Sequence, residues 1–306
     1  MSDQKQKVVV TGGAGFIGAH LVAQLLADGF EVHVVDNFAA GKKESRLHAD
    51  AVYHEVSVCD FDALAPIFEG ATYVFHLAAL PRVQFSIDHP QEAHETNVVG
   101  TFNVFLAAQR AKVSKVVYSS SSSVYGDQAV LPLTETMPPL PKSPYGLHKY
   151  IGELDAQMFS LIYQLPTVSL RYFNVYGPGG DPKDAYALVI PKFLDLRLQG
   201  QTMTITGDGT QTRDFTHVRD VVRANLLAAR SQTVTKGEVI NVGAGHNVSI
   251  NEIAALIGGP TAYIAPKFEP HDTLADNTLA KQLLGWEPTI TIEEGIAELK
   301  TIHGIK

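Results

Sequence analysis

The feature that most constrains the fold is a strand-like segment that runs into a glycine-rich turn and then a helix. Residues 7–11 are Lys-Val-Val-Val-Thr, residues 12–18 are Gly-Gly-Ala-Gly-Phe-Ile-Gly, and a helical apolar pattern continues to Ala27. The first three glycines permit a tight turn close to a pyrophosphate, and Gly18 lets the helix pack on the strand. A generic glycine-rich turn is the alternative, but the order strand, turn, helix is the context that a dinucleotide-binding fingerprint requires.

A second strand-like segment, residues 31–35, ends at Asp36, about twenty residues after the glycines. The Asp36 carboxylate can accept hydrogen bonds from an adenosine ribose, and its charge would repel a 2′-phosphate. The sequence therefore predicts a site for NAD rather than NADP.

Strand-like and helical segments continue to alternate along the chain. We expect strands at 51–58, 73–77, 115–119, 167–172, 202–206 and 238–242, and helices at 62–69, 91–111, 145–163, 190–198, 219–229 and from the N-cap Ser249 to Ile257. This order predicts an α/β protein with a Rossmann-type doubly wound parallel sheet, whose ligands lie at the carboxyl edge of the strands. We predict an NAD-binding domain of residues 1–172 with 217–242, and a smaller C-terminal α/β substrate-binding lobe of 173–216 with 243–306.

A tyrosine and a lysine stand four residues apart in Ser143-Pro-Tyr-Gly-Leu-His-Lys149. With Pro144 in the first turn of a helix, Tyr145 and Lys149 lie on one face. A fixed ammonium favours the phenolate and is expected to lower the pKa of Tyr145 from about 10. On spacing alone, an ordinary amphipathic helix is the better explanation.

Composition excludes several classes of protein. A formal net charge of −8 argues against general nucleic-acid binding, and Cys59 as the sole cysteine permits no intrachain disulfide and makes a zinc cluster improbable. We predict no metal site. The N-terminal residues do not resemble a signal peptide and no apolar run reaches membrane-spanning length, so we expect a cytoplasmic protein without a membrane partner.

The order of these motifs resembles the extended short-chain dehydrogenase/reductase family. The glycine turn, Asp36, Asn97, the serine run 119–123 and the Tyr145/Lys149 pair carry the resemblance over nearly the whole chain. The segments 171–177 and 213–218 resemble the sugar-nucleotide branch, and more narrowly the UDP-hexose 4-epimerases, including those that act on 2-acetamido sugars.

The resemblance implies roles for individual residues. Ser121, Tyr145 and Lys149 would be catalytic: Tyr145 as a phenolate base at the C4 hydroxyl, Ser121 as its hydrogen-bond partner, and Lys149 holding the nicotinamide ribose. The implied NAD contacts are Gly12, Gly15, Phe16, Ile17, Gly18, Asp36, Asn37, Ser57, Val58, Leu77, Ala78, Ala79, Asn97, Ser119, Tyr145, Lys149 and Phe173. The implied contacts with a UDP-sugar are Arg82, Ser121, Ser122, Ser123, Tyr145, Asn174, Val189, Arg213 and Thr273. For Arg213, a salt bridge with Asp214 or Asp220 is the alternative.

The same segments distinguish between related activities of the family. Dehydratases and uronate decarboxylases of the family have an acidic residue directly after the catalytic serine, whereas Ser122 and Ser123 stand here. Related uronate epimerases usually have an arginine where Gln84 stands, so a neutral sugar is favoured, although the nearby Arg82 leaves a uronate epimerase open. A non-catalytic NAD-binding protein is the less favoured alternative, because such proteins typically lose the tyrosine or the lysine.

Thr273 falls where the family gates the substituent at sugar C2, and a small residue there favours acetamido sugars. Three departures from the family pattern accompany it. Pro81-Arg82 replaces the small residues often seen beside the sugar. Ser57 replaces an aspartate that contacts adenine, and residues 265–271 lack the usual phosphate-binding arginine, for which Lys267 or His271 would have to substitute. The resemblance also implies a homodimer formed through helices near Pro90–Ala111 and Tyr145–Tyr163.

Overall fold

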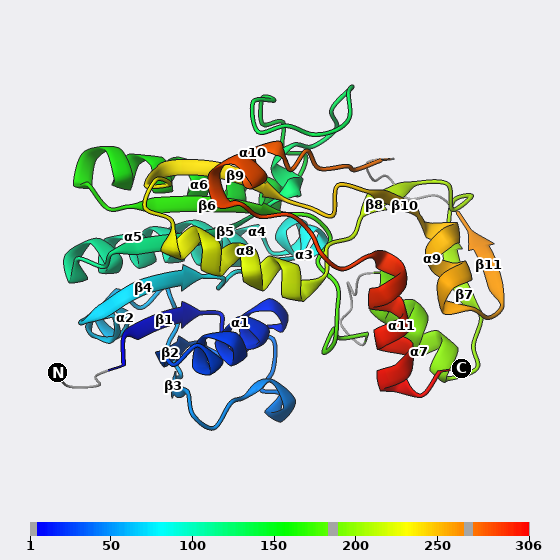
Figure 1. The fold of residues 1–306 in the computed structure, drawn as a ribbon, viewed down its shortest axis with the longest axis horizontal. Coiled ribbons are helices and arrows are strands. Elements are labelled where there is room, and N and C mark those ends of the chain that lie inside the picture. The colour runs from blue at the N-terminus through cyan, green and yellow to red at the C-terminus, as the bar shows by residue number, and fades with distance from the viewer. Residues whose placement is uncertain (1–4, 183–188, 266–271, 306) are drawn as a thin grey trace.

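The computed structural model describes residues 5–182, 189–265 and 272–305. Its centre is a sheet of seven parallel strands in the order β3-β2-β1-β4-β5-β6-β9 (Figure 1). The strands are β1 (Lys7–Thr11), β2 (Glu31–Val35), β3 (Val52–His54), β4 (Ala71–His76), β5 (Lys115–Ser121), β6 (Thr167–Tyr172) and β9 (Lys236–Val242). The predicted doubly wound parallel sheet is confirmed.

Helices cover both faces of this sheet, as Figure 1 shows. One face carries α5 (Gly100–Ala111) and α6 (Pro144–Tyr163), and the other carries α1 (Phe16–Ala27), α8 (Val218–Arg230) and α10 (Thr278–Leu284). The alternation of strand side chains divides the core accordingly: Val8 and Val10 pack with α1 and α8, whereas Val9 packs with α5 and α6. Burial on both faces explains the continuous apolar strand sequences.

The C-terminal elements form a second, smaller group around their own apolar core (Figure 1). They are α7 (Val189–Leu198), β7 (Met203–Thr206), β8 (Thr212–Asp214), β10 (Asn247–Ser249), α9 (Ile250–Ile257), β11 (Thr261–Ile264) and α11 (Ile292–His303). Ser249 caps α9 as expected, in a capping box with Glu252. The proposed boundaries between two domains stay a prediction.

Three predicted elements differ from those found. The helix expected at 91–111 is α4 (Pro90–His94), a π-helical turn (Glu95–Val99) and then α5. The strand expected at 51–58 is limited to β3, because a turn closed by Ser57 follows it. The helix expected at 62–69 is α2 (Phe61–Leu64) followed by a 3₁₀ turn. A short helix, α3 (Val83–Asp88), is an addition that the sequence did not predict.

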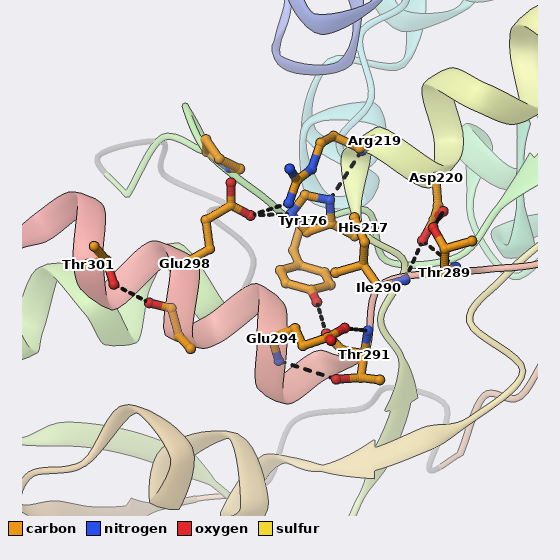
Figure 2. A network of polar contacts seen from close by, with 12 residues as sticks. Tyr176, His217, Arg219, Asp220, Thr289, Ile290, Thr291, Glu294, Glu298 and Thr301 are labelled. Atoms are coloured by element: carbon orange, nitrogen blue, oxygen red, sulfur yellow. Dashed lines mark hydrogen bonds and ion pairs between the residues drawn. The ribbon is translucent and has the colours of Figure 1, made fainter.

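Asp220, on the first turn of α8, joins the sheet helices to the C-terminal group. Its buried carboxylate accepts hydrogen bonds from the backbone N–H groups of Thr289 and Ile290, from the Thr289 hydroxyl and from Arg223. Figure 2 shows the contacts of Asp220 with Thr289 and Ile290, and His217, the N-cap of α8, nearby. One side chain thus fixes the segment that leads into α11.

Candidate active site

The glycine turn between β1 and α1 is packed too closely for side chains. Gly12 has a φ of +72°, and a Cβ there would lie 2.6 Å from the Ala78 backbone nitrogen. A Cβ on Gly18 would lie 2.2 Å from the Gly12 carbonyl oxygen. Gly15 is the N-cap of α1 and offers no capping side chain, so the first N–H groups of the helix are left for a ligand. This cradle fits a bound pyrophosphate.

Asp36 ties the end of β2 to the glycine turn. Its two carboxylate oxygens accept hydrogen bonds from the backbone N–H of Ala14 at 3.0 Å and of Phe38 at 2.9 Å. Each carboxylate oxygen can accept a further bond, so both keep acceptor capacity for the predicted ribose contact. The exposed Asn37 accepts from the Ala39 N–H and shapes the same loop.

Asn97 lies on the π-helical turn and is almost completely buried. Its side-chain oxygen accepts from the Leu80 N–H at 2.7 Å, and its amide donates to the Leu80 carbonyl at 3.1 Å. Both ends of this side chain therefore hold the loop after β4. That contact makes Asn97 a positioning residue for the loop in which Ala78 and Ala79 were predicted to meet NAD.

The other predicted cofactor residues lie along the same edge of the sheet. The Leu77 N–H donates to the Thr11 carbonyl, Ser57 accepts from the Cys59 N–H, and Val58 is buried. Phe16 and Ile17 begin α1 and pack partly against the core. The Phe173 ring, in contrast, is fully buried beside Tyr125, so only its backbone could meet a ligand.

The catalytic candidates Ser121, Tyr145 and Lys149 converge where β5 ends beside α6. The Lys149 ammonium donates to the Ser119 carbonyl at 2.7 Å and lies 5.9 Å from the centre of the Tyr145 ring. The Ser121 side chain lies close enough to the Tyr145 phenol to lower its pKa. Tyr118 lies under the ammonium, with its ring centre 5.0 Å away.

The pKa of Tyr145 in this catalytic group differs from the expectation. Burial raises the pKa of Tyr145 to about 12, while the hydrogen bond with Ser121 lowers it, although Tyr145 keeps part of its surface exposed. Burial also lowers the pKa of Lys149 to about 7. The expected lowering of the Tyr145 pKa is therefore wrong for the protein alone, because desolvation of the phenolate by burial is the largest influence on it.

Two turns fix the catalytic side chains. Ser121 accepts from the Ser123 N–H at 3.2 Å and from the Ser123 hydroxyl at 3.0 Å, which caps the 3₁₀ turn Ser122–Val124. Ser143 caps α6, and the fully buried Ser86 of α3 accepts from the Tyr145 N–H at 3.1 Å. These bonds satisfy two of the free N–H groups at the start of α6 and hold Tyr145 in place.

The predicted sugar-nucleotide residues Asn174 and Thr273 meet at Asp214. The Asn174 amide donates to the Asp214 carbonyl at 3.0 Å, and the Thr273 hydroxyl accepts from the Asp214 N–H at 3.3 Å. The buried Asp214 carboxylate accepts N–H groups from Ala244, Gly245 and Ala275. Burial nevertheless raises the pKa of Asp214 to about 6. One residue therefore organises three loops around the predicted substrate site.

Three further residues that were predicted to bind the substrate lie on three different elements. Arg213 is half-buried on β8 and donates to the Thr212 carbonyl, Arg82 is the N-cap of α3, and Val189 begins α7. Lys267 and His271, which the sequence offered as phosphate-binding substitutes, lie outside the described residues.

A further set of contacts joins residues 178–181 to α1 and to the loop after β2. Lys43, in the loop after β2, forms an ion pair with Asp181, and Arg46 donates to the Gly179 carbonyl at 2.7 Å. His20 of α1 contacts the Pro178 carbonyl at 2.8 Å. The loop that follows Asn174 is thereby fixed across the first turns of α1.

Sequence reasoning missed Ser86, Tyr118, Glu153 and Asp214. Glu153 could have been found, because it continues the four-residue spacing of Tyr145 and Lys149. Ser86 and Asp214 act through contacts between distant segments, for which the sequence carried no signal.

Comparison with known proteins decides the family. The model of the NAD dependent epimerase/dehydratase family matches residues 8–243. The chain belongs to this family. A putative UDP-glucose 4-epimerase of Methanocaldococcus jannaschii is 37% identical over 297 residues, covering 94% of this chain and 95% of that protein.

Solved structures of epimerases are similarly close. UDP-glucose 4-epimerase of Thermotoga maritima with UDP-glucose has a TM-score of 0.91 and 38% identity, covering 98% of both chains. UDP-N-acetylglucosamine 4-epimerase of Methanobrevibacter ruminantium, in complex with UDP-N-acetylmuramic acid, has a TM-score of 0.91 and 36% identity, covering 96% of this chain and 97% of that one. Other relatives, at 34–35% identity, are named a UDP-N-acetyl-α-D-glucosaminuronate decarboxylase and a UDP-glucuronate 4-epimerase. Family membership therefore does not by itself select the sugar.

This epimerase/dehydratase-family protein is NAD-dependent, and its residues fit the cofactor. The turn around Gly12 and Gly18 has no room for a Cβ, and Asp36 stands at the end of β2. Among the described residues, no group of three or more His, Cys, Asp or Glu side chains could hold a metal ion. Within the same ranges, none of the helices is both long and apolar enough to cross a membrane.

Proposed function

We propose that the protein interconverts UDP-hexoses by NAD-dependent epimerisation at C4. The observation that carries this proposal is the contact of Ser121 with Tyr145, with only hydroxyl side chains, Ser122 and Ser123, directly after Ser121. Dehydration needs an acid to expel a hydroxyl and a base beside the carbonyl. A phenol, a hydroxyl and an ammonium suit reversible oxidation of an alcohol instead.

The protein's own residues supply the proton chemistry. Bound NAD would supply the hydride acceptor and return the hydride to the opposite face of the sugar. Tyr145 accepts the proton of the C4 hydroxyl and returns it when the 4-keto sugar is reduced, while Ser121 hydrogen-bonds the reacting oxygen. Lys149, held by the Ser119 carbonyl, favours the phenolate when it is charged.

The substrate that we propose is an acetamido sugar, UDP-GlcNAc or UDP-GalNAc, with UDP-glucose and UDP-galactose accepted as well. Thr273 is small, and its hydroxyl is bonded to the Asp214 N–H, which leaves room where a tyrosine would fill the C2 side. Gln84, at the position of the uronate-binding arginine, donates to Asp88 on the exposed face of α3. We propose that Asn174 and Arg213 hold the diphosphate.

The decisive experiment is an NMR or chromatographic assay of the wild type across UDP-, GDP- and dTDP-sugars. Exchange between UDP-GlcNAc and UDP-GalNAc is expected, and conversion of no UDP-hexose would end the epimerase proposal. Thr273→Tyr is expected to suppress the acetamido reaction more than the glucose reaction, with Thr278→Tyr as an exposed control. Equal losses for both sugars would remove the role of Thr273.

We also propose a homodimer formed through α5 and α6. These neighbouring helices carry exposed apolar side chains: Phe102, Leu154, Met158, Leu161 and Ile162. Sedimentation should give a dimer for the wild type and a monomer for a Met158→Glu/Leu161→Glu variant. A monomeric wild type would refute this assembly. The cytoplasmic location stays a prediction.

A further inference from the structure

Three residues on one face of α6 each contact one residue of the serine run at the end of β5. The Tyr145 phenol lies close to the Ser121 side chain, the Lys149 ammonium donates to the Ser119 carbonyl, and Glu153 accepts from the Ser120 hydroxyl. Tyr145, Lys149 and Glu153 are spaced four residues apart, so they lie one above the other on the helix. Glu153 therefore occupies the next turn of the face that carries the catalytic pair.

Glu153 is a buried charge with a complete set of partners. It is 1% exposed, and it accepts from Arg171 Nε at 2.8 Å and from Arg171 Nη2 at 2.7 Å. The Arg171 guanidinium in turn stacks over Tyr125, 4.5 Å from the ring centre. Buried ion pairs are weak contributors to stability, because desolvation offsets their attraction and apolar replacements are often as stable. Stability alone is thus a poor explanation for a carboxylate at this position.

Proximity to Lys149 offers a better explanation. Burial lowers the pKa of the Lys149 ammonium to about 7, and the charge of Glu153 is the influence that opposes this lowering. Without that charge, a larger fraction of Lys149 would be neutral at physiological pH. The other titratable groups around the ammonium are Tyr118 of β5, His76 of β4, and Tyr145 and His148 of α6, and none of them is a carboxylate that could replace Glu153. A neutral lysine cannot favour the phenolate on the preceding turn.

We propose that Glu153 is a positioning residue for the catalytic pair: its buried carboxylate is the counter-charge on the helical turn next to the Lys149 ammonium, and its bond to Ser120 fixes α6 in register with β5. This assignment rests on the proposed roles of Tyr145 and Lys149. A purely structural Glu153 would affect folding but would leave the protonation of Lys149 unchanged.

The test measures Lys149 directly, so it does not depend on the identity of the sugar. NAD-loaded protein carrying [¹³Cε]lysine is titrated by NMR, and the Lys149 signal is assigned by its loss in Lys149→Met. In Glu153→Gln we expect the Lys149 midpoint to fall by about one pH unit, whereas Glu153→Asp, which keeps the charge, should stay within about 0.3 unit of the wild type. Asp155→Asn, a nearby carboxylate on α6, should leave the midpoint unchanged.

The same variants are compared in the epimerase assay. The pH at which kcat falls on the alkaline side of its profile should be lower in Glu153→Gln, by the same shift as the Lys149 midpoint in NMR. At pH values above that point, the variant should be about tenfold less active than the wild type. If Glu153→Gln does not fold, Glu153→Gln/Arg171→Met removes both charges and should lower the midpoint by a smaller amount, because the positive charge of Arg171 is lost as well. An unchanged Lys149 midpoint in either folded variant would overturn the proposal. A shifted midpoint in a protein that epimerises no UDP-hexose would instead refute the proposed function alone.

Discussion

Replacing Asp220 with asparagine should destabilise the segment that leads into α11, because the carboxylate is the common acceptor for that segment (Figure 2). One carboxylate oxygen accepts the N–H groups of Thr289 and Ile290, and the other accepts the Thr289 hydroxyl and Arg223. Asparagine has one acceptor oxygen, so its –NH₂ group must face either the two N–H donors or the Arg223 guanidinium.

The size of the effect follows from the bonds that are lost. Two charge-assisted hydrogen bonds at about 1.5–3 kcal/mol each, allowing for non-additivity, give a loss of about 3–5 kcal/mol for Asp220→Asn. At about 2.1 cal/mol/K per residue, the unfolding entropy of 306 residues is about 640 cal/mol/K. The melting temperature should therefore fall by about 5–8 °C.

The loss should also depend on pH. Burial raises the pKa of Asp220, but the hydrogen bonds from Arg223, Thr289 and Ile290 together lower it below its ordinary value. A lowered folded-state pKa contributes stability above the unfolded-state pKa, about 3.9, and this contribution disappears as the pH falls through the folded-state value. The difference between wild type and Asp220→Asn should be constant from about pH 5 to 8 and should shrink below about pH 4.

Urea unfolding and calorimetry, followed across this pH range, provide the measurement. Thr289→Val removes only the hydroxyl bond and is the matched control, with an expected loss of about 1 kcal/mol. A loss below about 1 kcal/mol for Asp220→Asn, or an equal loss for Thr289→Val, would refute the reasoning.

Three further predictions concern the active site. Tyr145→Phe should lower turnover by about 10²–10⁴-fold, measured by epimer exchange, while NAD stays bound; wild-type turnover would exclude Tyr145 as the base. Lys43→Ala, which removes the ion pair with Asp181, should release NAD about two- to fivefold faster in a trapping experiment, consistent with about 0.5–1 kcal/mol for a partly exposed pair. Gly18→Ala should abolish NAD binding or folding, because its Cβ would lie 2.2 Å from the Gly12 carbonyl oxygen; normal binding measured by calorimetry would contradict the fit of the turn.

The features predicted correctly from sequence are those set by local pattern. The turn around Gly12, the end of β2 at Asp36 and the helix that begins at Pro144 each follow from neighbouring residues. Ser121 and Tyr145 meet because β5 and α6 pack side by side in a doubly wound sheet.

The features missed from sequence depend on distant segments. The direction of the Tyr145 pKa shift is set by burial, which no spacing pattern reveals. The buried pair of Glu153 with Arg171 joins α6 to β6, and Asp214 joins loops that lie thirty or more residues away along the chain. Local propensity carries no information on such contacts.

The position of Asp214 has a consequence for evolvability. Because its carboxylate holds the backbone of Ala244, Gly245 and Ala275, the shape of these loops does not depend on the side chains that face a sugar. A substitution at Thr273 costs the fold little more than one hydroxyl bond. With the role that we propose for Thr273, sugar preference could change by a single replacement, without a new loop conformation having to arise at the same time.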